Sequence, residues 1–465
     1  MKRIINIFTI SVSFLAVSVS AFGQQNLRTA YFLDGYTYSY KMNPAMAPER
    51  KFTSLPILGN FGAGIESNLA IDNFLYPTGN GKLTTFLNNS VSDEQFLKGL
   101  NNLNKLNFSL NETILGTGFS TGKAFHTIDV SLKADAGVAI PKSLFAFMKT
   151  GASDGTDTWD ISRMGFRANM RMELAYGYSR PISDWIRVGA RVKLLVGMVN
   201  ANLLIDDLNL KMNGEEWAVT AHGNAEISAP VRFETKPGSN EIDFGEGEAS
   251  DIVGFLKKPS IGAAIDLGAS FDFLDYFTAS VSVLDLGFIG WNNTTTAVMP
   301  GGKWSFAGFE NTGDDNSIND QLDQLGESLT DMLKMEMTGS QIKKTNGLAA
   351  TIHAGVEARM PFYEKLSFGL LGTQRIDGIS SWTEGRLSAN VAPLNWFSAA
   401  ASFAVSNFGS SLGGVINIHL PGFNLYAGLD SFLPLFNVTP QFVPIKSMNT
   451  NFTFGIAFLG KANKK

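Results

Sequence analysis

Apolar and polar side chains alternate along most of this chain. From Phe397 to Ser406, every odd position carries Phe, Ala or Val, and every even position carries Ser or Ala. A period of two predicts a β-strand with one apolar face, because successive side chains of a strand point to opposite sides. Only Asp430 is charged between Arg386 and Lys446, but the alternation distinguishes this region from an apolar helix.

Similar alternation appears in six other segments, several of them longer than ten residues: 127–138, 166–178, 186–194, 261–273, 348–359 and 452–458. Strands of soluble proteins are usually shorter, whereas a tilted membrane strand needs about 9–11 residues within the lipid. Only helices and closed sheets can cross a bilayer. We therefore predict an all-β fold, a transmembrane antiparallel β-barrel of about 14 strands, since bacterial barrels prefer even strand numbers. A secreted soluble β-sandwich is the structural alternative.

Aromatic side chains lie beside the short turns that join these strands. The turns are Pro181 to Trp185, Phe273 to Tyr276, Pro361 to Tyr363, Pro393 to Trp396 and Pro421 to Phe423. Aromatic rings at this position are typical of the girdle at a membrane interface. The alternative is an ordinary hairpin with proline in the turn. Five such turns favour the girdle, and we expect them to face the periplasm.

The longer connections predict outward-facing loops, some of them helical. Ser92 to Gln95 reads as a capping box, and 322–333 carries Leu and Met at helical spacing. Phe145, Phe147 and Met148 form an apolar stretch after Pro141. Exposed apolar stretches of this kind often mark a partner or a ligand, so these three residues are candidate contact residues. Alternatively, the loops pack on one another over the barrel mouth.

The amino terminus predicts an export signal and then an irregular segment. Lys2 and Arg3 precede an apolar run, and Ala21-Phe22-Gly23 fits a cleavage site, which gives a signal peptide over 1–23. Pro44 and Pro48 exclude a regular helix or central strand in the tyrosine-rich segment that follows. We therefore divide the mature chain into an N-terminal plug segment (24–50), a barrel (51–460) and a C-terminal tail (461–465).

Composition agrees with a membrane barrel and excludes several classes of protein. Charged residues make up 17% of the 465 residues, below the roughly 25% of a typical soluble domain. The absence of cysteine excludes disulfide scaffolds, thiolate metal sites and cysteine nucleophiles. A formal net charge of −5 argues against nucleic acid as a partner. The four histidines lack metal-ligand spacing and no G-x-S-x-G motif occurs, so we expect no enzyme, metal or cofactor.

The most distinctive candidate chemistry is basic. If the apolar faces of 166–178 and 186–194 contact lipid, the cations of this hairpin point into the lumen: Arg167, Arg171, Arg187, Arg191 and Lys193. A cation on the lipid side would cost about 2–4 kcal/mol at the midplane. These five residues could form an anion or carboxylate site along a transport path. Alternatively, they pair across the lumen with acids and hold an interior plug; the candidate acids are Asp129, Asp135, Asp266, Asp272 and Glu357.

Asn43-Pro44-Ala45, just before the first strand, resembles the N-terminal motif of FadL-type outer-membrane transporters of long-chain fatty acids and other hydrophobic compounds. The strand and turn pattern over 50–460 also resembles a related, uncharacterised family of exported barrels. The resemblance implies a fourteen-stranded barrel in which Asn43, Pro44 and Ala45 form part of the plug. It also implies a ligand that enters from an apolar groove in the outer loops and leaves sideways through the wall. The C-terminal Phe458 to Lys465 departs from the terminal aromatic common in such barrels.

These observations predict an outer-membrane protein of a Gram-negative-type cell that takes up hydrophobic or amphipathic small molecules such as fatty acids passively. The expected partners are outer-membrane lipid, such a ligand, and the barrel-assembly machinery during biogenesis. The alternative is a non-transporting barrel that anchors a surface or secretion complex, because a shared fold does not decide function. A third option, a barrel hydrolase, requires a Ser or Asp beside His353 or His419.

Overall fold

The computed structural model describes residues 26–48, 50–78, 83–151, 158–212, 217–229, 233–243, 258–306, 334–432 and 449–462. The expected signal peptide lies outside these residues, as do 463–465 of the tail. The predicted helical face at 322–333 also lies outside them. Glu336, at the end of that loop, already belongs to a strand.

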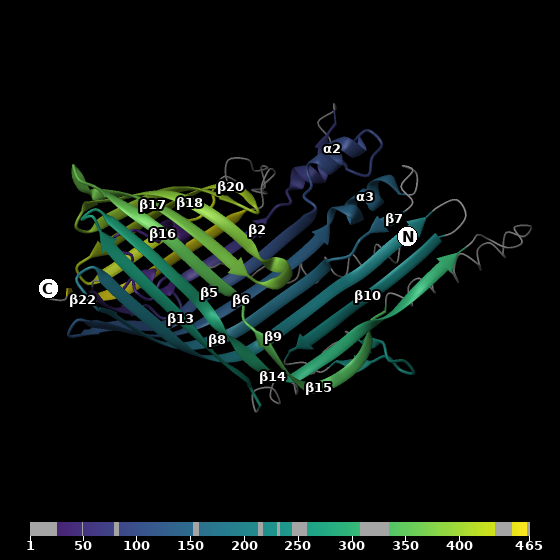
Figure 1. The fold of residues 1–465 in the computed structure, drawn as a ribbon, viewed down its shortest axis with the longest axis horizontal. Helices are drawn as coiled ribbons and strands as arrows, with labels where there is room; N and C mark the ends of the chain where they lie inside the picture. Colours follow the sequence, from purple (N-terminus) through teal and green to yellow (C-terminus); the bar gives the residue numbers. More distant parts are fainter. Residues whose placement is uncertain are drawn as a thin grey trace, which may run out of the picture.

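The described strands form a closed antiparallel barrel with fourteen strand positions, which confirms the predicted fold class (Figure 1). Ten positions hold one strand each: β5 (Leu103–Thr121), β6 (Ala124–Pro141), β9 (Ile186–Met212), β14 (Phe277–Phe306), β17 (Tyr363–Ile376), β18 (Trp382–Leu394), β19 (Phe397–Ser406), β20 (Gly409–Leu420), β21 (Phe423–Leu429) and β22 (Thr450–Ala462). The other four positions each hold two strands: β1 (Arg50–Ser54) with β2 (Phe61–Ser67), β7 (Thr158–Asp160) with β8 (Met164–Pro181), β10 (Trp217–Ser228) with β13 (Ser260–Phe273), and β15 (Glu336–Gly347) with β16 (Ala350–Met360). The barrel closes where β1 and β2 both pair with β22 and with β5.

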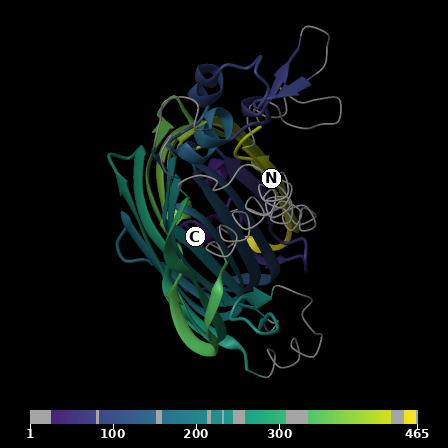
Figure 2. The ribbon, with the colours of Figure 1, turned by 90° about the vertical axis from the view of Figure 1, so that its right-hand side faces the viewer.

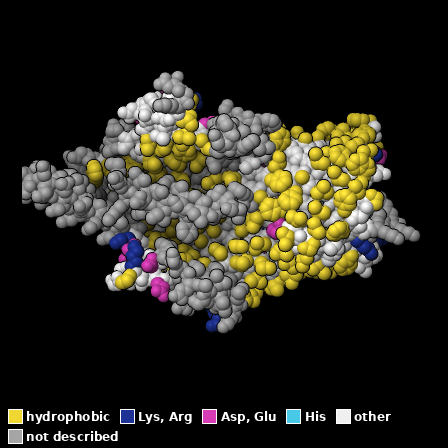
Figure 3. Space-filling view, turned by 180° about the vertical axis from the view of Figure 1, so that it is seen from behind, with side chains coloured by type: hydrophobic (Ala, Val, Ile, Leu, Met, Phe, Trp, Pro, Cys, Tyr) yellow, Lys and Arg dark blue, Asp and Glu magenta, His cyan; other side chains and the backbone are white. Residues whose placement is uncertain are grey.

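The alternation in sequence corresponds to an outer and an inner face of the wall. On β19, Phe403 and Val405 are 47% and 54% exposed, whereas Ser398 is fully buried. Leu194 of β9 and Ile261 of β13 are likewise exposed on the outside. Apolar side chains cover the outside of the barrel in a broad band (Figure 3). The small and polar residues therefore face the lumen, as the period of two predicts.

Short turns join the strands at one end of the barrel, called here the turn end. Large aromatic side chains are exposed at or beside these turns, namely Trp185, Phe273, Tyr276, Phe362, Tyr363, Trp396 and Phe423. The positions agree with the predicted girdle. At the opposite end, called the loop end, β9, β10, β14 and β15 project farthest (Figure 1).

Helices are few and short. α2 (Asp93–Lys98) begins at the predicted cap, because the Ser92 side chain accepts a hydrogen bond from the Gln95 backbone N–H. α3 (Lys142–Thr150) follows β6, and both helices lie at the loop end with the small hairpin of β3 (Leu75–Pro77) and β4 (Leu83–Thr85). The remaining short elements are η1 (Arg28–Ala30), η2 (Ser39–Lys41), η3 (Ile71–Asn73), η4 (Gly378–Ser380), β11 (Glu234–Thr235) and β12 (Ile242–Asp243). Among the described helices, none has the length and apolarity to span a membrane.

The segment 26–48 lies inside the barrel, with strands around it (Figure 2). It contains no strand, consistent with the two prolines, and its regular structure is limited to η1 and η2. Its aromatic and aliphatic side chains form the largest buried apolar cluster of the described residues, together with Phe52, Phe125 and Tyr426 of the wall. The core of this membrane protein is therefore the contact between this segment and the inner face of the wall.

Candidate functional site

The start of the N-terminal segment is anchored by buried ion pairs. The Arg28 guanidinium lies 2.8 Å from Glu66, 3.1 Å from Glu384 and 3.5 Å from Asp430. The backbone N–H groups of Arg28 and Thr29 also donate to the Asp430 carboxylate, at 3.0 and 2.7 Å. Breaking such a buried pair usually costs several kcal/mol. Arg28 therefore attaches the segment to three separate strands or strand ends.

Lys41 provides a second anchor. Its ammonium lies 3.2 Å from Asp129 of β6 and donates to the hydroxyls of Thr113 and Ser131, at 2.6 and 3.0 Å. Burial lowers the pKa of Lys41 to about 8, although the Asp129 carboxylate acts in the opposite direction. The charged form of Lys41 is thus held in the lumen against a desolvation cost.

The Asn43-Pro44-Ala45 motif packs against glycines of the wall. The Asn43 side-chain N–H groups donate to the carbonyls of Ala269 and Val281, both at 3.3 Å. A Cβ at Gly189 would collide with the backbone of Pro44, and one at Gly268 would collide with Asn43. Only glycine lets the segment approach β9 and β13 this closely. The structure thus places all three motif residues in the lumen, where a plug would lie.

Three of the five candidate cations lie in a buried charge network on the inner wall. Arg191 bridges Asp129 and Asp266, at 2.7 and 3.0 Å. Lys193 contacts Asp266 at 2.6 Å and also pairs with Asp285. Arg171 lies 2.9 Å from Glu173 and 3.5 Å from Asp135. Every one of these three cations has at least two carboxylate neighbours, so none offers an isolated charge to an anion.

The other two candidates lie toward the two ends of the barrel. Arg167 pairs with Asp377, which follows β17, and is partly exposed. Arg187 lies beside the turn end and is also only partly buried. The hairpin therefore distributes its cations along the whole height of the lumen instead of collecting them at one point.

Asp285 is a central member of the network that the sequence did not reveal. It contacts Lys133, Arg171 and Lys193. Asp285 directly follows Leu284 in β14, and both side chains are buried. Two buried residues in succession break the alternation of inward and outward side chains. The backbone of Asp285 has a positive φ of 60°, at an irregularity in the β13–β14 register. Such a bulge adds a residue on one strand and changes which side chains face inward.

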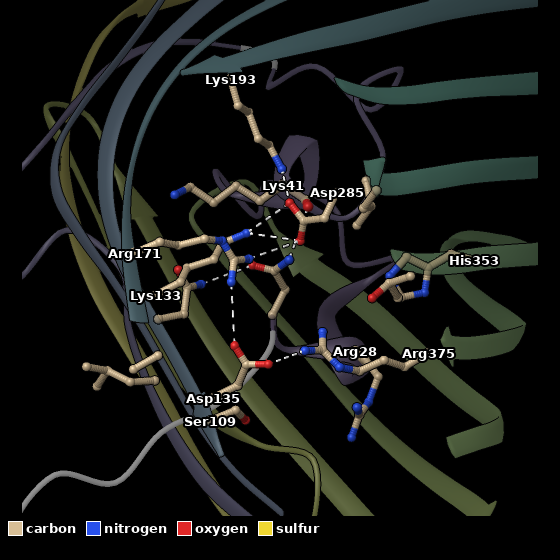
Figure 4. Close-up of a pocket in the computed structure, with 16 residues that line it drawn as sticks. Arg28, Lys41, Ser109, Lys133, Asp135, Arg171, Lys193, Asp285, His353 and Arg375 are labelled. Atoms are coloured by element: carbon tan, nitrogen blue, oxygen red, sulfur yellow. Dashed lines mark hydrogen bonds and ion pairs between the residues drawn. The ribbon is translucent and has the colours of Figure 1, made fainter. Parts of the chain in front are cut away.

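A polar cavity lies between the network and the N-terminal segment (Figure 4). It contains about 600 Å³ of free space, part of which is continuous with solvent. Its lining includes Arg28, Lys41, Asn111, His353 and Arg375. A second cavity, of about 380 Å³, shares Ser109, Asp135 and Arg375 with the first and extends to Trp382. The pair of cavities forms a polar space along the inner face of β5 and β6.

The wall is interrupted beside these cavities. β1 pairs with β5 only at Phe52 and Thr53, and β2 pairs with β5 only at Glu66 and Ser67. Over Phe61 to Ile65 the described chain shows no β-pairing with β5, although it pairs with β22 on its other side. We call the boundary between 55–65 and the facing part of β5, 108–114, the seam. Two backbone hydrogen bonds cross it, from Ile57 N–H to the Ile114 carbonyl and from Thr113 N–H to the Asn60 carbonyl.

Irregular backbone accompanies the seam. Ile57 has a positive φ of 68°, which is a strained conformation for a β-branched residue. Ile57 and Leu58 are 66% and 40% exposed, whereas Asn60, which contacts Tyr426 of the lumen cluster, is 2% exposed. The residues that interrupt the wall therefore present apolar side chains outward, where the barrel faces lipid.

The apolar loop candidates lie at the loop end and contact one another through a small core. Phe145 is 5% exposed and packs with Phe74 and Phe96. Phe147 packs against Trp159, whereas Met148 is 40% exposed. Phe145 thus packs inside the loop cluster, and Met148 is the most exposed of the three candidate contact residues.

The N-terminal segment contacts two histidines of the wall, His353 and His419. The His353 ring hydrogen-bonds to Thr373 at 3.0 Å and packs near Tyr31 of the N-terminal segment. His419 lies against Gly35. Within the described ranges no three His, Asp or Glu side chains are arranged to hold a metal ion.

Taken with the fold, these contacts define a transmembrane β-barrel whose lumen is occupied by its own N-terminal segment. The chain belongs to a family of unknown function, DUF5723, whose model matches residues 44–430. The expected relation to an uncharacterised barrel family is thereby confirmed. No curated protein matches the chain.

Several solved structures are similar to the chain. The Ralstonia pickettii toluene transporter TbuX has 9% identity and a TM-score of 0.41, with 96% of this chain and 100% of that chain covered. The P. putida toluene transporter TodX has 7% identity and a TM-score of 0.38, with 94% and 95% covered. A Pseudomonas aeruginosa FadL homologue has 10% identity and a TM-score of 0.38, with 95% and 100% covered. The last belongs to the class that the Asn43-Pro44-Ala45 motif resembles.

Proposed function

We propose that the protein is an outer-membrane barrel that admits hydrophobic or amphipathic small molecules, such as fatty acids, by passive uptake. The observation that supports this most directly is the seam. A wall held by complete β-pairing has no lateral exit, whereas the seam combines absent pairing, strained backbone and outward apolar side chains. Lipid on the outer side would accept the apolar part of a ligand that passes through it.

The cavities support a route from the loop end to the seam. Both cavities touch β5 at Ser109, and the larger one also contacts Leu110 and Asn111, which face the seam. A ligand that leaves through the seam would thus pass from a polar interior to an apolar exterior. In this proposal the N-terminal segment closes the turn end, and the buried ion pairs of Arg28 and Lys41 keep it seated against the wall.

One experiment tests the route by closing the seam with a disulfide. Continuing the β2–β5 register from Glu66 and Asn107 places Ala63 opposite Leu110. The natural chain has no cysteine, so Ala63→Cys with Leu110→Cys forms the sole disulfide. Vesicles with a lipopolysaccharide outer leaflet would carry the oxidised protein, and uptake of a labelled fatty acid would be followed. We expect oxidation to remove most of the uptake and a reductant to restore it.

The matched control is a pair in the fully bonded wall, Ala389→Cys with Ala401→Cys, which already face each other across β18 and β19. Its disulfide should leave uptake unchanged. Equal uptake by vesicles with and without the wild-type protein would refute transport itself. Undiminished uptake through the oxidised seam pair would refute the lateral route alone.

A non-transporting barrel in a surface or secretion complex is the second candidate. The anchored N-terminal segment and the charge network favour it, because they fill much of the lumen with mutually paired side chains. Purification from native membranes distinguishes the two candidates. A protein partner at fixed stoichiometry, with no uptake in vesicles, would support the scaffold.

A further inference from the structure

β5 presents unpartnered hydrogen-bond acceptors in the seam and directly beside it. The side-chain oxygens of Asn107 and Asn111 and both carboxylate oxygens of Glu112 are buried and have no hydrogen-bond partner among the described residues. The Asn107 and Asn111 amide N–H groups are used, because they donate to the carbonyl of Ser380 and to the side chain of Asn26. The unmet requirement on this strand is therefore for donors.

Glu112 is the strongest of these acceptors. It is 9% exposed, so the carboxylate is nine-tenths buried. It lies in the part of β5 that has lost its pairing with β2, and it faces Leu132 across the β5–β6 ladder. Lys41 is the charged group that acts on Glu112, but the Lys41 ammonium is already bound to Asp129, Thr113 and Ser131. A buried carboxylate without a partner is costly, which makes it a strong site for a donor.

The cations of the lumen, unlike Glu112, already have partners of opposite charge. Among the arginines of the lumen, Arg28, Arg191 and Arg386 have guanidinium N–H atoms without a hydrogen-bond partner in the described part of the chain. Each of these guanidiniums is already paired with two or more carboxylates. An anionic headgroup that entered the cavities would have to compete with those carboxylates, whereas a donor headgroup at the seam would replace no existing contact.

We propose that the seam selects amphiphiles whose headgroup is a hydrogen-bond donor, above all alkylammonium ions, and that Glu112 is the residue that recognises the headgroup. In the cavity, the ammonium donates a hydrogen bond to the side-chain oxygen of Asn111, which is part of the cavity lining. The ammonium then binds the Glu112 carboxylate in the seam. The alkyl chain lies outward along Ile57 and Leu58. This inference depends on the proposed lateral route and narrows its substrate class.

The test compares molecules of equal chain length in the vesicle assay described above. Dodecylamine, dodecanol and dodecanoate would be presented to wild-type protein and to Glu112→Gln. We expect wild-type protein to accelerate dodecylamine uptake most. Glu112→Gln should reduce dodecylamine uptake about tenfold, the effect of losing one hydrogen bond to a charged group, and should change dodecanoate uptake little. Unchanged migration of the unboiled barrel in gel electrophoresis would show that Glu112→Gln folds.

The control variant is Glu364→Gln, which removes the same charge at the exposed turn end and should leave all three rates unchanged. Equal acceleration of amine and acid, with no effect of Glu112→Gln, would overturn the headgroup selection and leave passive uptake standing. An equal loss for all three molecules in Glu112→Gln would also overturn it, since a merely structural role has that result. No acceleration of any molecule by wild-type protein would remove the proposed function, and this inference with it.

Discussion

Arg28 should control how firmly the N-terminal segment stays in the lumen. Arg28 is 4% exposed, and its guanidinium forms ion pairs with Glu66, Glu384 and Asp430. The Cζ atom of the guanidinium lies 4.7 Å from the centre of the Trp382 ring. Replacing Arg28 with methionine keeps most of the volume but leaves Glu66 without the ion pair. Glu384 and Asp430 keep Arg386. Removing one member of a buried ion pair costs about 3–5 kcal/mol. Arg28→Met should therefore raise the displaced fraction of the segment at least about a hundredfold.

The displaced fraction can be measured through a single thiol. Ala30 is fully buried between the segment and the wall, and the chain has no natural cysteine, so Ala30→Cys reacts with a maleimide only when the segment leaves its place. We expect the labelling rate in the Arg28→Met background to exceed the wild-type rate by at least about a hundredfold, provided displacement stays rare. Arg180→Met, an exposed arginine at the turn end, is the control. A labelling rate within threefold of the wild type, about 0.65 kcal/mol, would refute the view that Arg28 is an anchor.

Two further predictions concern the charge of the segment and the outer face. Burial holds the pKa of Lys41 near 8 in the seated segment, against its ordinary 10.5, so the displaced state binds more protons between these values. Seating should strengthen as pH rises from about 8 to 10.5; the Ala30→Cys labelling rate, divided by the rate for unfolded protein, should fall over that interval, and Lys41→Met should abolish the trend. A flat profile in the wild type would contradict this. Leu370 is 60% exposed on the outer face of β17, so Leu370→Arg should destabilise the barrel by about 2–4 kcal/mol in urea unfolding from vesicles. Phe362→Arg, in a turn, should cost about 1 kcal/mol or less, and equal costs at the two positions would argue against the membrane band.

Much of the fold could be predicted from the sequence because the features that define the wall depend on residues close together in the chain. The face of each side chain follows from its parity, as at Phe403 and Ser402, and the turn positions follow from proline beside an aromatic residue, as at Pro361 and Phe362. The helix cap at Ser92 could be predicted for the same reason, because it involves a hydrogen bond to Gln95, only three residues away. Parity fails where a bulge adds a residue, and for that reason Asp285 was not recognised as a member of the charge network.

The candidate site was predicted only in part. The inward direction of Arg171, Arg191 and Lys193 follows from the alternation. The carboxylates that Arg191 contacts are more than sixty positions away in the chain, and they are brought to it by strand register. Arg28 and Lys41 were missed, because nothing in an irregular segment indicates which wall residues it will contact. Glu112 was missed for a related reason. Its proposed role depends on two things that it lacks among the described residues, a hydrogen-bond partner and pairing with β2.

The sequence alone determined that this chain forms a closed wall with an apolar outside, because side-chain parity and turn composition act over a few residues and the bilayer accepts few architectures. Tertiary structure alone decided how the lumen is filled. Register between β9 and β13 places Arg191 beside Asp266, and glycines at Gly189 and Gly268 admit the N-terminal segment. The seam likewise exists only where β2 meets β5, since hydrogen bonding between distant segments, or its loss, cannot be read from either segment by itself.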